Sequence, residues 1–512
     1  MSYAPTDEQS AAAEAFTSGE PLAIQAGAGT GKTSTLAFLA EQTPGRRGRY
    51  LAFNRAIALD AASRFPATVA CKTAHSLAYA AIGYRFRDRL NSPRRPGWQV
   101  GQDLGLHTPA RIHGRDLPTS TLSNTTLRTV TRYCQSADRE LAHHHVPRLR
   151  GLESEDAHEE LANLVIPYAM KAWADLQSPQ MGMVRFEHDH YLKMWALTDP
   201  VLHGDYLLLD EAQDTNGVVE QIVLAQRGHS QIVMVGDSAQ AIYGWRGARD
   251  VMADFDARHL TLTRSFRFGP LLADEANRWL TISKAPIQLT GSADISTSVG
   301  PHTGHPDAVL CRTNIGAVSE ILSLLKDGIR PALVGGGESL RGLAQAAHDL
   351  IQGRRTHHPE LVLFTTWAAL REYAEHDPAG RDLQPFANLV DEHGPDAILQ
   401  AVGRLLPEEQ AQVAVSTAHR AKGREWARVR IAPDFTPPPD TDETDATGRP
   451  VPGAIDEAEA RLAYVAVTRA RRHLDPAGLA WINQHPDNPE PASVEPKQSR
   501  AQPHATGRIL GS

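Results

Sequence analysis

The sequence predicts an α/β protein built from two parallel-sheet lobes. Two series of short apolar runs, each leading into a loop and then a helical pattern, indicate this fold class. Such strand–helix–strand units place parallel strands side by side and bind ligands at the strands' carboxyl ends. The length of 512 residues exceeds what one hydrophobic core organises, which also favours several domains.

Nine apolar runs predict the central strands. Those of the first lobe are expected at residues 22–26, 50–53, 68–71, 206–210 and 232–237. Those of the second lobe are expected at residues 308–312, 331–336, 413–417 and 429–433. We therefore expect the first lobe to comprise 1–83 and 196–266, and the second to comprise 267–337 and 408–479.

Four other stretches lack this strand pattern. Residues 84–195 and 338–407 are expected to be mainly helical insertions of the first and second lobe. The segment 436–450 is acidic and proline-rich, and we expect a solvated loop there. Residues 480–512 are polar and rich in proline, which predicts a disordered tail.

Composition excludes several classes of protein. With 41% hydrophobic and 22% charged residues the chain is typical of soluble globular proteins, and it contains no apolar run of about 18 residues that would span a membrane. The first residues, MSYAPTDEQS, lack a secretory pattern. Three widely spaced cysteines exclude a four-cysteine metal site and a disulfide framework, so we expect a cytoplasmic protein. The net charge of −8 does not exclude a local groove for nucleic acid.

The segment AGAGTGKT follows the first predicted strand and opens a helix. This context is typical of a P-loop, whose backbone N–H groups surround the phosphates of a nucleoside triphosphate. Lys32 is expected to reach the β- and γ-phosphates and Thr33 to hold Mg²⁺. A glycine-rich turn with an incidental lysine is the alternative. The expected phosphate-binding residues are Ala26, Gly27, Ala28, Gly29, Thr30, Gly31, Lys32, Thr33 and Ser34.

The segment LLLDEAQD contains an apolar strand that ends in two acidic residues. Asp210 is expected to organise Mg²⁺ and Glu211 to polarise the attacking water, although a pair of helix-capping acids is the alternative interpretation. Gln213 and Asp214 are expected to couple this site to the second lobe. Gln9 precedes the first strand, where its amide can pair with the hydrogen-bonding edges of adenine.

The segment VMVGDSAQAIYGWRGA, residues 233–248, places a glutamine next to a tyrosine and a tryptophan. A machine that couples ATP turnover to nucleic-acid bases requires a phosphate sensor close to aromatic side chains, because bases stack on aromatic rings whatever their sequence. An ATP-driven DNA motor is therefore the leading interpretation.

The ordered set of motifs resembles the superfamily 1A DNA helicases of the UvrD/Rep/PcrA group, over roughly residues 5–80, 186–270 and 410–474. The stretches HDHYLKMWAL and STAHRAKGREW are most similar to the motor of the F-box DNA helicase branch, and we expect no F-box-like segment ahead of it. The resemblance implies two RecA-like lobes of a P-loop NTPase. It also implies an ATP-dependent DNA helicase with 3′ to 5′ polarity in DNA repair or recombination.

The same resemblance implies roles at the nucleotide. Gln240 would sense the γ-phosphate, and Arg267 and Arg469 would contact it from the second lobe. Phe266 would lie near the adenine and Glu425 near the nucleotide sugar. The expected catalytic residues are Lys32, Asp210, Glu211, Gln240, Arg267 and Arg469.

The resemblance further implies a path for single-stranded DNA across both lobes. Trp245 is the expected base-stacking platform, with Tyr243 and Arg246 beside it. Single-stranded and tailed duplex DNA are the expected partners of a monomeric motor, with no membrane involved. The other expected DNA contacts are Phe53, Asn54, Thr73, His75, Thr417, His419 and Lys422.

Two alternative functions remain open. The insertion of the second lobe is shorter than in the best-known members of the family, which favours a DNA-stimulated translocase that strips proteins with little unwinding. A nucleotide-switched DNA-binding scaffold is the other alternative. Separately, the run 143–145 of three histidines has no cysteine or acidic pattern at ligand spacing, and we expect it to be a solvated loop.

Overall fold

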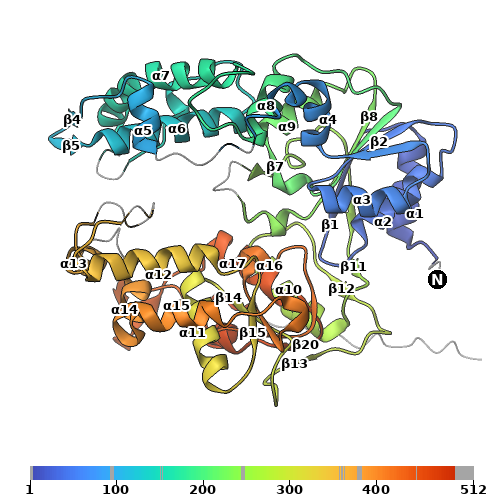
Figure 1. Cartoon of the computed structure of the whole chain (residues 1–512). Coiled ribbons are helices and arrows are strands. Elements are labelled where there is room, and N and C mark those ends of the chain that lie inside the picture. The colour runs from blue at the N-terminus through green and yellow to red at the C-terminus, as the bar shows by residue number, and fades with distance from the viewer. Residues whose placement is uncertain are drawn as a thin grey trace, which may run out of the picture.

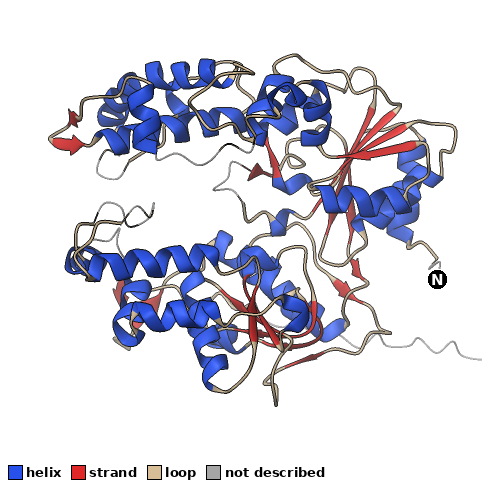
Figure 2. Cartoon of the chain, in the orientation of Figure 1, coloured by secondary structure: helices blue, strands red, loops and turns tan. Residues whose placement is uncertain are grey.

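Two six-stranded, fully parallel sheets form the centres of two α/β lobes, and the predicted fold class is confirmed (Figures 1 and 2). The structure is a computed structural model. It describes residues 4–90, 92, 97–149, 152, 154–243, 248–356, 358, 361, 364–376, 383–444 and 447–489. Within these residues, no helix has the length and apolar character that crossing a membrane would take.

The sheet of the first lobe has the strand order β10-β1-β8-β6-β2-β3. Alternate side chains of each strand point to opposite faces, so Ile24 and Leu208 pack under α1–α3 while Leu207 and Leu209 pack under α4, α8 and α9. The strands are β1 (Leu22–Ala26), β2 (Gly48–Leu51), β3 (Val69–Lys72), β6 (Tyr206–Leu209), β8 (Gln231–Gly236) and β10 (Arg258–Leu262). The helices are α1 (Asp7–Thr17), α2 (Lys32–Glu41), α3 (Arg55–Arg64), α4 (Ala74–Ala81), α8 (His188–Ala196) and α9 (Gly217–Leu224).

The sheet of the second lobe has the order β13-β20-β17-β14-β16-β15. Its strands are β13 (Ser298–Val299), β14 (Ala308–Cys311), β15 (Pro331–Leu333), β16 (Val413–Thr417), β17 (Trp426–Ile431) and β20 (Ala470–Asp475). Helices α10 (Pro270–Ile282) and α17 (Glu457–Val467) share one core with this sheet. Helix α11 (Asn314–Lys326) covers a second core, and the short α16 (Ala418–Ala421) follows β16.

Each lobe carries an inserted subdomain with its own small core, and both project from the same side of the molecule (Figure 1). The first contains η1 (Gly83–Phe86), α5 (Gly97–Asp103), β4 (Ala110–Ile112), β5 (Arg115–Leu117), α6 (Thr119–Gln135), η2 (His143–His145) and α7 (Glu155–Leu176). The second contains α12 (Glu338–Ile351), α13 (Trp367–His376), α14 (Gln384–His393) and α15 (Pro395–Gly403), followed by η6 (Glu408–Gln410).

Three expectations need correction. Strands β10, β13 and β20 were not predicted, because their sequences, RHLTL, SV and ARRHLD, lack a continuous apolar run. The acidic segment contains an exposed hairpin of β18 (Asp440–Thr444) and β19 (Pro450–Pro452). The expected disordered tail is wrong for residues 480–489, because η7 (Ala477–Gln484) buries Ile482 and the Trp481 indole donates to the Phe435 carbonyl at 2.8 Å. Residues 490–512 lie outside the described residues.

Candidate nucleotide site and lobe interface

The P-loop lies between β1 and α2, where two glycines adopt left-handed backbone conformations. Gly29 has φ of 76° and Gly31 has φ of 78°, which side-chain-bearing residues rarely adopt. A Cβ on Gly29 would stand 2.6 Å from Arg267 Cβ, and the Gly29 carbonyl accepts from the Phe266 N–H at 2.8 Å. The loop therefore packs against the segment that links the two lobes.

Lys32 and the first turn of α2 complete the loop. The Lys32 ammonium lies 3.5 Å from the carbonyl oxygens of Ala26 and Gly27, inside the curve of the loop. A Cβ on Gly31 would lie 3.8 Å from the Phe266 ring and 3.9 Å from Gln9 Nε2. The two residues expected near adenine thus flank one position of the P-loop. Of the other predicted loop residues, Ala28 and Thr30 are buried and Ser34 is exposed.

A hydroxyl and a carboxylate meet beneath the loop. Thr33 Oγ1 donates to Asp210 Oδ2 at 2.7 Å, and the Tyr50 hydroxyl donates to the same oxygen at 2.6 Å. Burial and the neighbouring Glu211 raise the pKa of Asp210. Burial, followed by the charge of Asp210, raises the pKa of Tyr50, which therefore remains a donor. Oxygen donors of this kind suit Mg²⁺. Tyr50 was missed from the sequence, because a tyrosine in an apolar strand is indistinguishable from a core residue.

Glu211 follows β6 in a left-handed conformation with φ of 53°. Such a conformation costs a residue with a side chain of order 1–3 kcal/mol, and it persists where the surroundings enforce it. Gln213 Nε2 donates to Glu211 Oε2 at 2.7 Å. Burial opposes ionisation, but Lys32 and Lys422 hold the pKa of Glu211 below its ordinary value. Glu211 is thus an oriented carboxylate, ready to accept a proton.

A chain of hydrogen bonds continues from Gln213 across the end of β8. Its Oε1 accepts from the Asp237 N–H at 3.0 Å, and Asp237 Oδ2 accepts from Gln240 Nε2 at 2.5 Å. Gln240 belongs to η4 (Ser238–Gln240), and its Oε1 accepts from Arg469 Nη2 at 3.3 Å. Arg469 comes from the second lobe and is only 1% exposed. Burial, with the charge of Arg267, lowers the pKa of Arg469 to about 9.

Tyr464 joins the two lobes at the same point. This residue of α17 accepts from the Ala28 N–H at 2.9 Å and donates to Asp237 Oδ2 at 3.0 Å. Its hydroxyl therefore bridges the P-loop backbone and a buried carboxylate of the first lobe. Sequence reasoning missed Tyr464, although it lies five residues before Arg469 in the same motif.

The second predicted arginine is paired within the site. Arg267 Nε lies 2.7 Å from Glu425 Oε2, and its Nη1 donates to the Thr468 carbonyl at 3.0 Å. Glu425, expected near the nucleotide sugar, thus contacts the arginine. The Gln9 amide, expected at adenine, donates to Thr35 Oγ1 at 2.9 Å and caps α1 through its oxygen.

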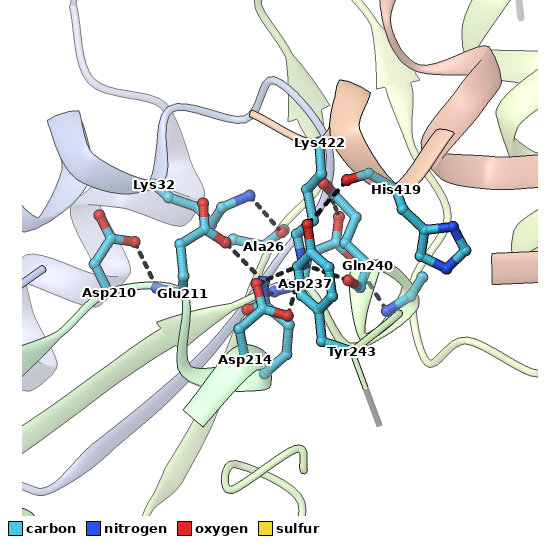
Figure 3. A network of polar contacts seen from close by, with 12 residues as sticks. Ala26, Lys32, Asp210, Glu211, Asp214, Asp237, Gln240, Tyr243, His419 and Lys422 are labelled. Carbon is cyan, nitrogen blue, oxygen red and sulfur yellow. Dashed lines mark hydrogen bonds and ion pairs between the residues drawn. The ribbon is translucent and has the colours of Figure 1, made fainter. Parts of the chain in front are cut away.

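Lys422 occupies the interface between the lobes (Figure 3). Its ammonium lies 2.5 Å from Asp214 Oδ2 and donates to the Gln240 carbonyl at 2.5 Å. It also lies 5.2 Å from the ring centroid of Tyr243, whose hydroxyl donates to the His419 carbonyl at 2.9 Å. Lys422, expected on the DNA path, thus brings a positive charge of the second lobe into contact with the sensor segment and with the Asp214 carboxylate of the first lobe.

The remaining expected DNA contacts fall into two groups. Asn54, Thr73 and Thr417 accept from backbone N–H groups at the starts of α3, α4 and α16, so their side chains cap helices. Phe53 and His75 line a cavity of about 90 Å³ together with Asp210, Glu211 and Asp214. His75 also pairs with Asp189 at 3.0 Å, and Phe53 is 52% exposed. Trp245 and Arg246 lie outside the described residues.

A P-loop in one parallel-sheet lobe, faced by arginines from a second, defines a P-loop NTPase with two RecA-like lobes. Residues 195–257 match the UvrD/REP helicase N-terminal domain, and residues 372–475 match the UvrD-like helicase C-terminal domain. Two segments of the chain are thus similar to the two halves of UvrD-like helicases.

Similar proteins extend the match to nearly the whole chain. F-box DNA helicase protein 1 of Schizosaccharomyces pombe is 29% identical over 505 residues, covering 89% of this chain and 55% of that protein. F-box DNA helicase 1 of Gallus gallus is 29% identical over 490 residues, covering 89% of this chain and 47% of that protein. The ATP-dependent DNA helicase PcrA of Leuconostoc citreum is 33% identical over 129 residues, covering 23% of this chain and 17% of that protein. The chain thus spans about half the length of the F-box helicases that it matches.

Proposed function

We propose that this chain is an ATP-dependent DNA helicase that translocates 3′ to 5′ on single-stranded DNA and unwinds duplex DNA in repair or recombination. The observation that carries the proposal is the continuous polar network between the expected ATP site and the expected DNA motifs. It runs from Glu211 through Gln213 and Asp237 to Gln240, and then through Lys422 to Asp214. The names of the similar proteins support a DNA helicase.

The residues fit a nucleoside triphosphate. Lys32 lies within the P-loop for the β- and γ-phosphates, and Thr33 with Asp210 would hold Mg²⁺, which neutralises phosphate charge when bound. Glu211 is oriented to take a proton from the attacking water. Arg267 and Arg469 supply positive charge from the second lobe where charge develops in the transition state.

In this proposal, the network would couple hydrolysis to movement along DNA. Gln240 contacts Arg469 through its side chain and Lys422 through its carbonyl, so loss of the γ-phosphate changes the partners of both. Lys422 and Tyr243 belong to the segments expected to line the DNA path. Alternate closing and opening of the lobes would then move the strand in steps.

Steady-state ATP hydrolysis with and without single-stranded DNA, in Mg²⁺ at low salt, tests the proposal. We expect DNA to stimulate hydrolysis at least about tenfold, which corresponds to roughly 1.4 kcal/mol of barrier. The variant Lys32→Ala should abolish hydrolysis while single-strand binding persists. Hydrolysis that ignores DNA would favour a nucleotide-switched scaffold, and hydrolysis that persists in Lys32→Ala would disprove the P-loop assignment.

A translocase that strips proteins with little unwinding is the second candidate, favoured by the small four-helix insertion at α12–α15. Release of streptavidin from biotinylated oligonucleotides separates the two and reports polarity. A 3′ to 5′ motor releases streptavidin from the 5′ end and not from the 3′ end. A helicase also separates a 3′-tailed duplex at a comparable ATP cost, whereas the translocase releases streptavidin but leaves the duplex paired.

A further inference from the structure

Two residues of the three-histidine run, His144 and His145, form a compact cluster with one acidic residue, which corrects the expected description of this run as a solvated loop. His144 Nε2 lies 2.8 Å and His145 Nε2 lies 2.9 Å from the same oxygen, Asp138 Oδ2. The two rings are 4.1 Å apart at 38°. His145 is only 2% exposed. The loop after α6 brings Asp138 back to η2, a proximity that ligand spacing in the sequence did not reveal.

His145 is held from its far side. Its Nδ1 lies 3.1 Å from the Ala142 carbonyl oxygen and 3.0 Å from the Ala142 nitrogen, and its ring packs edge-on against Tyr133 at 5.4 Å. The Ala142 N–H donates to Nδ1, which places the ring proton on Nε2 toward Asp138. A metal ion at Nε2 would displace that proton, and a proton on Nδ1 could then be donated to the Ala142 carbonyl. Metal-ligating histidines are typically oriented in this way, by a backbone carbonyl or carboxylate at the other ring nitrogen.

The surrounding polar groups hold the loop's backbone. Ser136 Oγ lies 3.0 Å from His145 Nε2 and also within 3.0 Å of the Tyr133 carbonyl, to which it can donate. Lys193 of α8 donates to the carbonyls of Ser136, at 2.9 Å, and Asp138. The carboxylate of Asp138 therefore faces the two imidazoles, while the Asp138 carbonyl accepts a hydrogen bond from Lys193.

We propose that Asp138, His144 and His145 bind one divalent transition-metal ion of the Zn²⁺ class. Two imidazole nitrogens and one carboxylate oxygen suit Zn²⁺, Co²⁺ or Ni²⁺ far better than Mg²⁺ or Ca²⁺. Tetrahedral bonds of about 2.0–2.1 Å place ligand atoms about 3.3 Å apart, so the observed 2.8 and 2.9 Å must widen by about 0.5 Å. The exposed His144 and Asp138 side chains can make that movement.

Such an ion would fasten the end of α6 to η2, next to Lys193 of α8, and so stiffen the junction between the insertion and the first lobe. The site also adjoins a groove of about 1180 Å³ lined by His143, His144 and Arg148, which leaves the fourth coordination position accessible to water. This role is independent of the proposed helicase activity.

Titration of the full-length, nucleotide-free protein with Co²⁺ tests the site, because tetrahedral Co²⁺ absorbs visible light strongly. We expect one equivalent with a tetrahedral spectrum that Zn²⁺ abolishes. His144→Ala removes an exposed ligand. We expect the affinity for Co²⁺ to fall at least about 10–100-fold, because loss of a group that only hydrogen-bonds to a metal ligand already has an effect of that size. His143→Ala is the matched control, since this neighbour is exposed and outside the cluster, and it should bind as the wild type does.

Thermal unfolding supplies a second readout that does not depend on spectra. Added Zn²⁺ should raise the Tm of the wild type and of His143→Ala, and not that of His144→Ala or Asp138→Asn. Circular dichroism without metal checks that each variant is folded. If His144→Ala binds Co²⁺ as tightly as the wild type, the proposal is overturned and the cluster is only hydrogen-bonded. If His143→Ala loses as much affinity as His144→Ala, the proposal is overturned in favour of non-specific binding.

Discussion

Lys422 of the second lobe and Asp214 of the first form an ion pair at the lobe interface, with side chains only 9% and 2% exposed. The pair lies between the Gln240 carbonyl, which also accepts from Lys422, and the ring of Tyr243 (Figure 3). Because its two halves belong to different lobes, the pair can form only while the lobes are close. The pair therefore depends on the contact between the lobes that this structure shows.

Removal of Lys422 should destabilise the protein strongly. Lys422→Met leaves the Asp214 carboxylate buried without its cation, and breaking such a buried pair costs about 3–5 kcal/mol. Urea unfolding followed by tryptophan fluorescence measures the loss. Asp214→Asn added to Lys422→Met should restore much of it, because the uncompensated charge is then gone.

Arg424→Met is the control for that measurement. Arg424 lies two residues further along the same loop and pairs with Glu408, and both side chains are partly exposed to solvent. Pairs of this kind contribute about 0–1 kcal/mol. If Lys422→Met loses no more stability than Arg424→Met, the interface pair does not hold the lobes together.

The same carboxyl should make stability depend on pH. Burial raises the pKa of Asp214 to about 6 from an ordinary value of 3.8, although Lys422 opposes the rise. The folded carboxyl thus binds its proton more tightly than the unfolded one, so its contribution to stability grows as pH falls through 6 and levels off below about 4. The difference between the folded pKa of about 6 and the ordinary value of 3.8 corresponds to roughly 3 kcal/mol of unfolding free energy.

The contribution of the Asp214 carboxyl can be isolated with the variant Asp214→Asn, because the amide cannot titrate. The unfolding free energies of the wild type and this variant are compared from pH 8 to 4. The wild type should gain on the variant as the pH falls through about 6. A difference that stays constant over the range would mean that Asp214 titrates normally.

Sequence motifs predicted those site residues that follow directly after a predicted strand. Thr33 and Asp210 follow separate parallel strands, and the carboxyl ends of those strands bring them to 2.7 Å. Tyr50 and Tyr464 were not predicted, because a tyrosine in an apolar segment gives no sign of where its hydroxyl points. The cluster of Asp138 with two histidines depends likewise on a loop whose course only the folded chain defines.

Arg469→Lys should reduce ATP turnover by about 10³-fold or more, since an arginine finger stabilises the transition-state charge to that extent. The lysine keeps a positive charge but lacks the guanidinium that reaches Gln240 and the Thr468 hydroxyl. The kcat at saturating ATP and single-stranded DNA measures the effect. Arg471→Ala is the control, because this half-exposed arginine lies 3.5 Å from Glu425 and its loss should change kcat by no more than about twofold. A decrease below tenfold in Arg469→Lys would exclude the finger role.

Phe53→Ala should weaken binding of single-stranded DNA while leaving the fold intact. The ring is 52% exposed and lines the cavity that also contains His75 and Asp214, so it is available to stack on a base beside the carboxylates. Stacking contributes about 1–3 kcal/mol per base, which predicts roughly a 5- to 150-fold rise in Kd. Fluorescence anisotropy with a labelled oligothymidylate measures this rise. The control is Leu59→Ala, which removes an apolar side chain of the adjacent α3 that is 65% exposed. Because general loss of apolar surface would affect both variants alike, only a selective loss in Phe53→Ala supports a base-stacking contact at this position.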